Sequence, residues 1–588
     1  MNNKIKQYEI IEEIAKSGHR VHRVNNYYLH SKYDPIREAI RFADQHYRKH
    51  HLHILFGIGS GHIVKALSEK MGEDEFLIVI EPLDDLVNIQ LGDEIELKRT
   101  IIVGVRSLDN FQQLCDTLLA QRFNNRVQVI CSPNYDKLFL EEYRGILGII
   151  KDLLHVQKIN QNTIQAFSNE WQRNFILNLF YAFDDVPLTM LQDYFNVPIV
   201  VVSGGPSLTK QIPLLRKIRK HVLLISSGST INTLLNFNIE PDFVVTIDSQ
   251  IINYRHFESI QLKDTVMIYS LSHHEKILEA INRRSIFFIP NIQLEIRPYA
   301  EKLLDKEVPN ILGGASVATF ALSIAYNISS GPIALIGQDL AYTDNKTHAE
   351  HNKNFQKIDE SYIKARGMVY TKGYYAEQVL TDYPFLMMKH NFEKLIQTFP
   401  HRERVYNCTE GGVSIEGYQQ ISFQEFCDLH VNTNKVVPVF DMNSYPHKEI
   451  HEWKAFLMRI EDQIKLHDKV MRLVEEAILL LKRNTSNAVF DKKILRQLDK
   501  IDEKLKPIFD EGMMSLIAKP IILDVFNNYL PKENETEQEA YKRIYARSLD
   551  LYSRLREAAV DSRESFIELR AKVQNNIMSM GKDKEGEK

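Results

Sequence analysis

The sequence predicts a multidomain α/β protein with a central Rossmann-like doubly wound sheet, a smaller N-terminal α/β domain and an all-α helical C-terminal domain. Three observations lead to this fold class. At 588 residues the chain is too long for one hydrophobic core, so two to four domains are expected. Short apolar runs alternate with helical patterns up to about residue 430. Beyond about residue 445 strand patterns stop, and apolar residues recur at helical spacing.

Composition and charge exclude several classes of protein. The chain is 44% hydrophobic and 26% charged, as globular proteins are, and its net charge of −4 provides no positive field for nucleic acid. Four widely spaced cysteines without a Cys-x-x-Cys pair argue against a disulfide framework and a zinc site. The N-terminus is too polar for a signal peptide, and polar residues, glycine and proline interrupt the longest apolar region, 313–337. We therefore expect a soluble, cytoplasmic protein without membrane insertion.

Residues 1–150 are expected to form the smaller, Rossmann-like α/β domain. A strand from about His53 runs into a turn with Gly57, Gly59 and Gly61, and Glu81 ends the next strand. This spacing is typical of a nucleoside-binding turn in which the acid takes the ribose hydroxyls. The same alternation of strands and helices fits a purely structural domain at least as well. Both interpretations stay open.

Residues 151–195 are predicted to be a helical connector, and residues 196–430 the domain that carries the site. Apolar residues of the connector fall mostly at three- and four-residue spacings. Six strand-like runs follow, most of them separated by helical patterns, which predicts a doubly wound sheet. These runs are 199–203, 222–226, 243–247, 266–270, 286–289 and 332–337.

Residues 431–588 are predicted to be helical throughout. An apolar stripe from Ile450 to Leu481, broken only at His467, indicates one long helix. Further helices are expected at about 493–517 and 536–577. The charged tail 581–588 cannot build a core and is expected to be disordered.

The most informative motif is the strand end Ser203-Gly204-Gly205-Pro206-Ser207. The glycines permit close backbone approach, Pro206 suits the first position of a helix, and Ser207 can donate beside the unpaired N–H groups of a helix start. A phosphate is the expected ligand. A plain turn between strand and helix explains the motif about as well, so the neighbouring strand ends must decide.

Polar residues follow five strand-like runs of this domain, and ligands of open parallel sheets bind beyond the carboxyl ends of the strands. A shared site is therefore predicted. Ser227, Gly228 and Asp248 suit a nucleoside, although such an Asp is also a common helix cap. Small residues around Gly314 and Ser316 suit a ligand-facing helix start and close helix packing equally. The remaining candidates are Gln338 and Asp339 after a strand, and Glu410, Gly411 and Gly412, which would close the site from the other side.

Together these stretches resemble the Maf (motility-associated factor) flagellin glycosyltransferases, whose central domain is similar to the small bacterial sialyltransferases. The resemblance rests on the order and spacing of the motifs and covers about 195–420, while the flanking domains fit only in arrangement. The motifs lie at 202–208, 239–248, 313–318, 335–342 and 407–417.

The resemblance implies transfer of a nonulosonic acid, of pseudaminic or legionaminic type, from a CMP-activated donor to Ser or Thr of flagellin, with no further cofactor. It implies that Gly204–Ser207 hold the phosphate and ribose of CMP, and that Tyr342 steadies the departing phosphate. Such sialyltransferases carry Asn at the position of Gly204, so any contact of that side chain is lost or replaced here.

The sequence does not single out a general base. Sialyltransferases use a histidine in a region that here lacks one, so the candidates are Asp339, His348, His351 and Asp382. Loss of a phosphate from a ketosidic carbon needs hydrogen-bond donors and one base. No metal is expected, because loop residues such as Asp344 and His351 are more often solvated than bound to an ion.

Two other functions stay open. A related glycine loop occurs in archaeal pterin pyrophosphokinases, which would need ATP and magnesium. The missing histidine and the altered asparagine fit a non-enzymatic flagellin-binding assembly factor. The added α/β and helical domains favour a protein acceptor. For such a protein the resemblance implies a transferase needed for flagellum assembly and motility.

Overall fold

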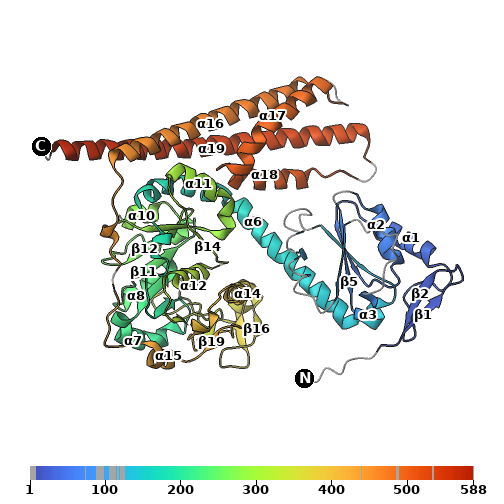
Figure 1. Cartoon of the computed structure of the whole chain (residues 1–588), viewed down its shortest axis with the longest axis horizontal. Coiled ribbons are helices and arrows are strands. Elements are labelled where there is room, and N and C mark those ends of the chain that lie inside the picture. The colour runs from blue at the N-terminus through green and yellow to red at the C-terminus, as the bar shows by residue number, and fades with distance from the viewer. Residues whose placement is uncertain are drawn as a thin grey trace. The chain divides into compact units, whose positions relative to one another are not determined.

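The structure is a computed structural model, and its chain divides into two compact units, Met1–Ala166 and Phe167–Lys588 (Figure 1). Helix α6 (Leu140–Asp184) runs through the boundary between them. The structure describes residues 8–72, 75–87, 99–104, 111, 114–115, 118, 126–281, 283–314, 316–438, 440–484, 489–532 and 535–586.

The first unit contains a parallel sheet in the order β6-β5-β4-β7 and a small antiparallel sheet, β1-β2-β3, that the sequence analysis missed. Strand β4 (Leu52–Phe56) is buried at every position, and all of its residues except His53 are apolar. Helix α1 (Pro35–His46) begins at a proline and is capped by the Asp34 side chain. The other elements are β1 (Ile10–Ile14), β2 (Arg20–Val24), β3 (Tyr27–Tyr28), α2 (His62–Lys70), β5 (Phe76–Glu81), α3 (Asp84–Val87), β6 (Thr100–Gly104), β7 (Val127–Cys131) and α5 (Tyr135–Leu138).

The second unit is built on a parallel sheet in the order β14-β13-β12-β11-β10-β9-β15-β18-β19, with β8 beside β13. All six strand runs predicted from the sequence are present, and the predicted α/β multidomain class is confirmed. The strands are β8 (Val186–Pro187), β9 (Ile199–Val202), β10 (Leu223–Ser227), β11 (Phe243–Thr246), β12 (Val266–Ser270), β13 (Ile286–Pro290), β14 (Asn310–Ile311), β15 (Ile333–Ile336), β18 (Val405–Asn407) and β19 (Gln419–Gln420).

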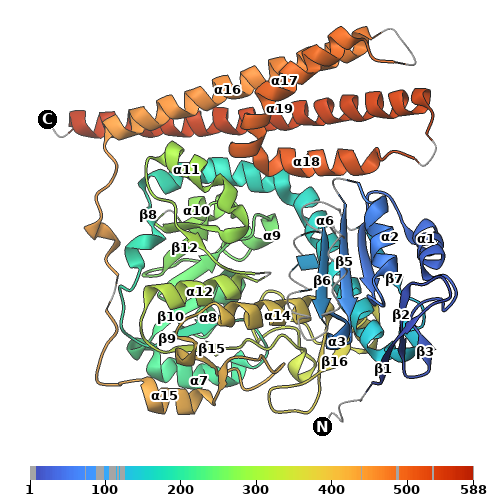
Figure 2. The same cartoon turned by 45° about the vertical axis from the view of Figure 1, so that its right-hand side comes forward.

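Helices cover both faces of this sheet (Figure 2). Leu223 and Ile225 of β10 join the core under α12 (Val317–Ile328), whereas Leu224 joins the core under α7 (Leu208–Ile218) and α15 (Phe423–His430). Alternate residues of a strand point to opposite faces, so both faces are apolar. The remaining elements are α8 (Ile231–Asn236), α9 (Ile251–Tyr254), α10 (Lys276–Ile281), α11 (Arg297–Leu304), α13 (Glu360–Arg366), β16 (Val369–Thr371), β17 (Val379–Thr381) and α14 (Tyr383–Gln397).

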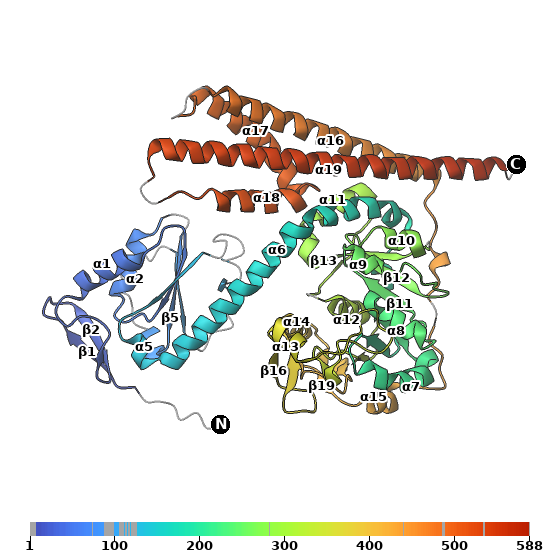
Figure 3. The same cartoon turned by 180° about the vertical axis from the view of Figure 1, so that it is seen from behind.

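The C-terminal part is helical, with α16 (Ile450–Arg483) and α19 (Glu537–Gly586) side by side (Figure 1, Figure 3). Trp453 and Phe456 of α16 share a core with Phe287 of β13, so these helices pack onto the sheet domain. The single helix expected at 493–517 is two, α17 (Lys492–Glu511) and α18 (Ser515–Asn528), because the backbone becomes extended at Gly512. Helix α19 continues to Gly586, where a disordered tail is predicted from 581, and residues 587–588 lie outside the described part.

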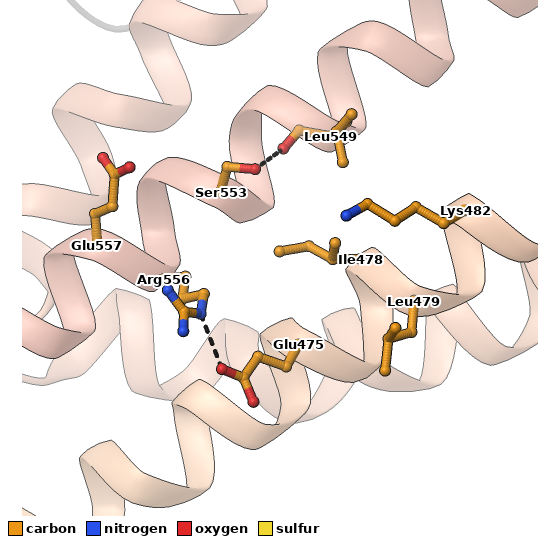
Figure 4. Close-up of a pocket in the computed structure, with 8 residues that line it drawn as sticks. All are labelled: Glu475, Ile478, Leu479, Lys482, Leu549, Ser553, Arg556 and Glu557. Carbon is orange, nitrogen blue, oxygen red and sulfur yellow. Dashed lines mark hydrogen bonds and ion pairs between the residues drawn. The ribbon is translucent and has the colours of Figure 1, made fainter.

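A cavity of about 540 Å³ opens between α16 and α19 (Figure 4). Apolar side chains such as Ile478 and Leu549 line it, and Arg556 at its side donates to Glu475 over 2.9 Å. None of the strand-end loops of the sheet contributes to it, so it is separate from the candidate site. Among the helices of the described residues, none is long and apolar enough to cross a membrane.

Candidate functional site

The candidate site lies where the strand order reverses. The chain leaves β9 toward β10 on one side, and β15 later takes the other side of β9. Such a switch point leaves a crevice beyond the carboxyl ends of the two central strands, where ligands of doubly wound sheets bind. The loops at this point are Ser203–Ser207 after β9 and Gly337–Asp339 after β15.

The loop after β9 is hydrogen-bonded to the Asp339 carboxylate. The Ser207 hydroxyl donates to Asp339 Oδ1 over 2.6 Å, and the Ser207 N–H lies 3.2 Å from both carboxylate oxygens. A Cβ at Gly205 would overlap this carboxylate and lie 2.5 Å from the Gly337 carbonyl oxygen, so the position requires glycine. The sequence analysis assigns the Ser207 donors to a phosphate, but in the structure both of them donate to Asp339. Burial raises the pKa of Asp339 to about 6.

Gly204 faces a different set of groups. A Cβ at this position would lie 3.0 Å from Asn352 Nδ2, 3.1 Å from Thr230 Oγ1 and 3.8 Å from His348 Cδ2. The Gly204 carbonyl accepts from the Ala349 N–H over 2.9 Å, which ties this loop to residues 343–358. Within the described part of the chain the Gly204 N–H has no partner. Polar groups therefore surround the side of the glycine loop that lies away from Asp339.

The neutral His348 ring has a defined tautomer. Its Nδ1 lies 3.1 Å from the Asn354 carbonyl oxygen, which can only accept, so Nδ1 carries the proton. The neutral ring then has its lone pair on Nε2, next to the Cδ2 atom that faces Gly204. Burial lowers the pKa of this half-buried histidine, which keeps the ring neutral near pH 7. His351, the other histidine of this loop, is exposed and packs its ring on Phe237.

Tyr342 and Asp382 are hydrogen-bonded to each other. The buried Tyr342 hydroxyl donates to Asp382 Oδ2 over 2.7 Å, and Arg366 lies 3.4 Å from the same oxygen. Asp382 Oδ1 accepts from the Phe385 N–H and caps α14. Burial and this carboxylate raise the pKa of Tyr342. Asp382 thus acts as a helix cap in this structure, and the Tyr342 proton is already donated.

The ends of β10 and β11 supply the nucleoside candidates. The Ser227 and Thr230 hydroxyls lie 2.8 Å apart, and a Cβ at Gly228 would lie 2.8 Å from the Phe257 ring. Asp248 stays exposed, yet surrounding protein atoms raise the pKa of its carboxyl. Asn253 donates to the Asp248 carbonyl oxygen over 2.8 Å and so fixes the backbone of this strand end.

The turn Glu410–Gly412 packs against the Ser207 end of the glycine loop and against Asp339. A Cβ at Gly411 would overlap the Ser207 hydroxyl, and Gly412, with φ of +69°, packs against the Asp339 backbone. Glu410 accepts from the Phe423 N–H over 2.9 Å at the start of α15. Gln338 accepts from the Ser203 hydroxyl and thereby links the two central loops.

Gly314 and Ser316 have local roles. Ser316 caps α12 by accepting from the Ala318 N–H over 3.2 Å, and a Cβ at Gly314 would lie 2.7 Å from Asn391 of α14. The described contacts of these two residues do not include the glycine loop. Pro206 lies in the turn before α7, where its carbonyl accepts from the Thr209 N–H.

The sequence analysis missed Asn352, Asn253 and Arg366, and it did not single out Thr230. Thr230 lies in one of the polar strand ends, and its position three residues after Ser227 is the only signal that could have singled it out. Asn352 lies in a long loop with no strand beside it to mark it. Within the described residues, no group of three or more His, Cys, Asp or Glu is placed to hold a metal ion.

The glycine turn of the first unit is filled by the chain's own side chains. The Ile58 N–H donates to Glu81 over 2.8 Å, and the Gly59 N–H donates to the Tyr135 hydroxyl over 2.9 Å. Tyr135 in turn donates to Glu81 over 2.7 Å, and the Ser60 N–H donates to His30 Nε2. Burial raises the pKa of Glu81 to about 7. Of the two interpretations of this turn, the structural one agrees with these contacts.

Comparisons with known proteins agree with this architecture. The family described as 6-hydroxymethylpterin diphosphokinase MptE-like matches residues 173–345. Among solved structures, the MAf glycosyltransferase from Magnetospirillum magneticum AMB-1 is similar over 99% of this chain and 93% of its own, with 12% sequence identity and a TM-score of 0.54. A comparison with curated proteins finds no match. The chain therefore has the fold of a MAf glycosyltransferase over almost its whole length, which confirms the predicted resemblance at the level of fold.

Proposed function

We propose that this protein is a glycosyltransferase that moves a nonulosonic acid, of pseudaminic or legionaminic type, from its CMP-activated form to Ser or Thr hydroxyls of flagellin. The observation that carries the proposal is the extent of the structural likeness. It spans 99% of the chain and so includes the N-terminal unit and the C-terminal helices as well as the sheet domain. Together with the predicted motifs, this favours a Maf-type transferase acting in the cytoplasm.

The polar side of the glycine loop suits the donor. The carboxyl ends of β9, β10 and β11 place Gly204, Ser227 and Asp248 at one edge of the sheet, where a nucleoside and its phosphate would bind. Hydrogen-bond donors at that edge would stabilise the charge that develops on the departing CMP.

His348 is the base that the geometry supports best. In the proposed step its Nε2 takes the proton of the acceptor hydroxyl while that oxygen bonds to the ketosidic carbon of the donor. The bond from this carbon to the phosphate oxygen breaks, and CMP leaves with the electron pair. Asp339 and Asp382 are less suited, because both already accept hydrogen bonds from the chain. Tyr342 can serve the departing phosphate only after its hydroxyl leaves Asp382.

The direct test is the intact mass of flagellin from cells that express the protein, flagellin and the sugar pathway together. We expect one added nonulosonic acid for each modified Ser or Thr, and no addition with His348→Ala. Titration of the purified protein with CMP, ATP and a pterin separates the other functions. Binding of ATP and pterin without CMP would favour a pterin pyrophosphokinase, and flagellin binding without modification would favour an assembly factor.

A further inference from the structure

Asn352 takes up the space beside Gly204 that a side chain at that position would otherwise enter. A Cβ at residue 204 would lie only 3.0 Å from Asn352 Nδ2, closer than most real Cβ contacts. We propose that Asn352 is a donor-binding residue whose amide N–H contacts the phosphate group of the CMP-activated donor. The inference rests on the function proposed above and adds to it a residue that the motifs do not contain.

The Asn352 amide is fixed in orientation. Its Oδ1 accepts from the Asn354 N–H over 2.9 Å, and its Nδ2 donates to the Ser229 carbonyl oxygen over 3.0 Å. The residue is 5% exposed, so packing also holds its side chain in place. An amide nitrogen carries two hydrogens, and the Ser229 bond uses one of them. Among the described residues the second N–H has no acceptor, and its nitrogen lies 3.0 Å from the place of a Cβ at Gly204.

The charge distribution favours the Gly204 side of the loop for an anion. Behind the loop, the Asp339 carboxyl already occupies the Ser207 donors and would repel a phosphate when ionised. On the Gly204 side, the Asn352 amide nitrogen and the Thr230 hydroxyl lie 3.0 and 3.1 Å from the place of a Cβ at residue 204, and within the described residues the Gly204 N–H has no partner. Backbone and amide N–H groups of this kind bind phosphate oxygens. Residue 352 therefore supplies from a distant loop a donor that glycine at 204 cannot supply.

The test compares CMP with cytidine, which lacks the phosphate. Calorimetric titration of the full chain gives dissociation constants for the wild type, Asn352→Ala, Gly204→Asn and the double variant. We expect Asn352→Ala to weaken CMP binding roughly tenfold and to leave cytidine binding unchanged, because a hydrogen bond to a charged group is lost. Gly204→Asn alone should also weaken CMP binding, because its side chain crowds the Asn352 amide. The double variant should recover part of the affinity, because the new amide enters the space vacated at 352.

Asn232→Ala is the matched control, because the Asn232 amide is similarly buried and also donates to one backbone carbonyl, that of His256. This variant should bind CMP as the wild type does, and melting curves check that all variants fold. Equal losses for CMP and cytidine in Asn352→Ala, or no loss for either, would overturn the role of Asn352 while leaving the proposed function intact. A wild type that binds no CMP would overturn the proposed function, and this inference with it.

Discussion

The two glycine turns of this chain look alike in sequence but differ in which backbone N–H groups the chain's own side chains use. Both follow a buried parallel strand and precede a helix, at Gly57–Gly61 in the first unit and at Ser203–Ser207 in the second. In the first turn, three successive N–H groups, of residues 58, 59 and 60, donate to side chains of the same unit. In the second turn the N–H groups of Gly205 and Ser207 are used, and Gly204 faces polar groups that a ligand can share.

The difference lies in which side of the turn the neighbouring acid reaches. Glu81, at the end of the strand beside β4, accepts from the turn and is joined there by Tyr135. Asp339, just beyond the strand beside β9, lies against Gly205 and accepts hydrogen bonds from its turn at Ser207. A glycine-rich turn is thus a binding site only where the chain does not satisfy its N–H groups itself.

The largest expected effect comes from His348→Gln. Loss of a general base lowers transfer by about 10²- to 10⁴-fold, while CMP binding changes little because His348 acts on the acceptor. Mass spectrometry of flagellin over time, with calorimetric CMP titration, gives both quantities. His30→Gln in the other turn is the matched control and should leave the transfer rate unchanged. Equal transfer by His348→Gln and the wild type would remove His348 from the mechanism.

A smaller but diagnostic effect is expected from alanine at the two glycines of the second turn. Gly205→Ala forces a methyl group into the Asp339 carboxylate and the Gly337 carbonyl, so it should lower the free energy of unfolding by about 3 kcal/mol. The same variant should also lose CMP binding. Gly204→Ala meets its nearest atom at 3.0 Å and should cost about 1 kcal/mol or less. Urea unfolding of both variants measures the contrast. Equal losses at the two positions would mean that the Gly204 side is as closed as the Gly205 side.

Tyr135→Phe tests the first turn by itself. Removing the hydroxyl leaves the Gly59 N–H without its acceptor and Glu81 with one donor fewer, which should cost about 1 to 3 kcal/mol. Hydrogen exchange in peptides from β4 and β5 measures this loss of local stability. The affinity for CMP should stay at the wild-type value. A loss of CMP affinity without loss of protection would place the nucleotide in the first unit.

The smallest effect is the pH dependence of the first unit. Because the folded state raises the pKa of Glu81 to about 7, the native chain binds more protons than the unfolded chain between about pH 4.5 and 7. The contribution of Glu81 to the unfolding free energy is therefore most favourable below that range and falls as pH rises through 7. Hydrogen exchange at pH 5.5 and 8, with Glu81→Gln as a non-titrating reference, should show the wild type losing protection relative to the variant at the higher pH. A constant difference would contradict the raised pKa.

Sequence patterns predict the strands of the sheet domain well, because apolar runs are local signals, and the polar residues at the strand ends can be read from the sequence in the same way. Sequence patterns do not predict which residues the loop side chains bond to. Ser207 and Asp339 meet across 132 positions of the chain, and Asn352 reaches Ser229 across 123. Side chains this far apart in sequence are brought together only by the sheet topology. The break at Gly512 between α17 and α18 also escapes prediction, because the apolar spacing continues across it.

The central claim is that the nucleotide binds beside Gly204 and not at the turn of the first unit. A crystal structure of the full chain with CMP tests this most directly. The account predicts a phosphate oxygen within hydrogen-bond distance of the Gly204 N–H and Asn352 Nδ2, with the Glu81 and Tyr135 bonds of the first turn intact. Density for CMP at residues 57–61, or a Gly204 side without CMP at saturating concentration, would contradict it.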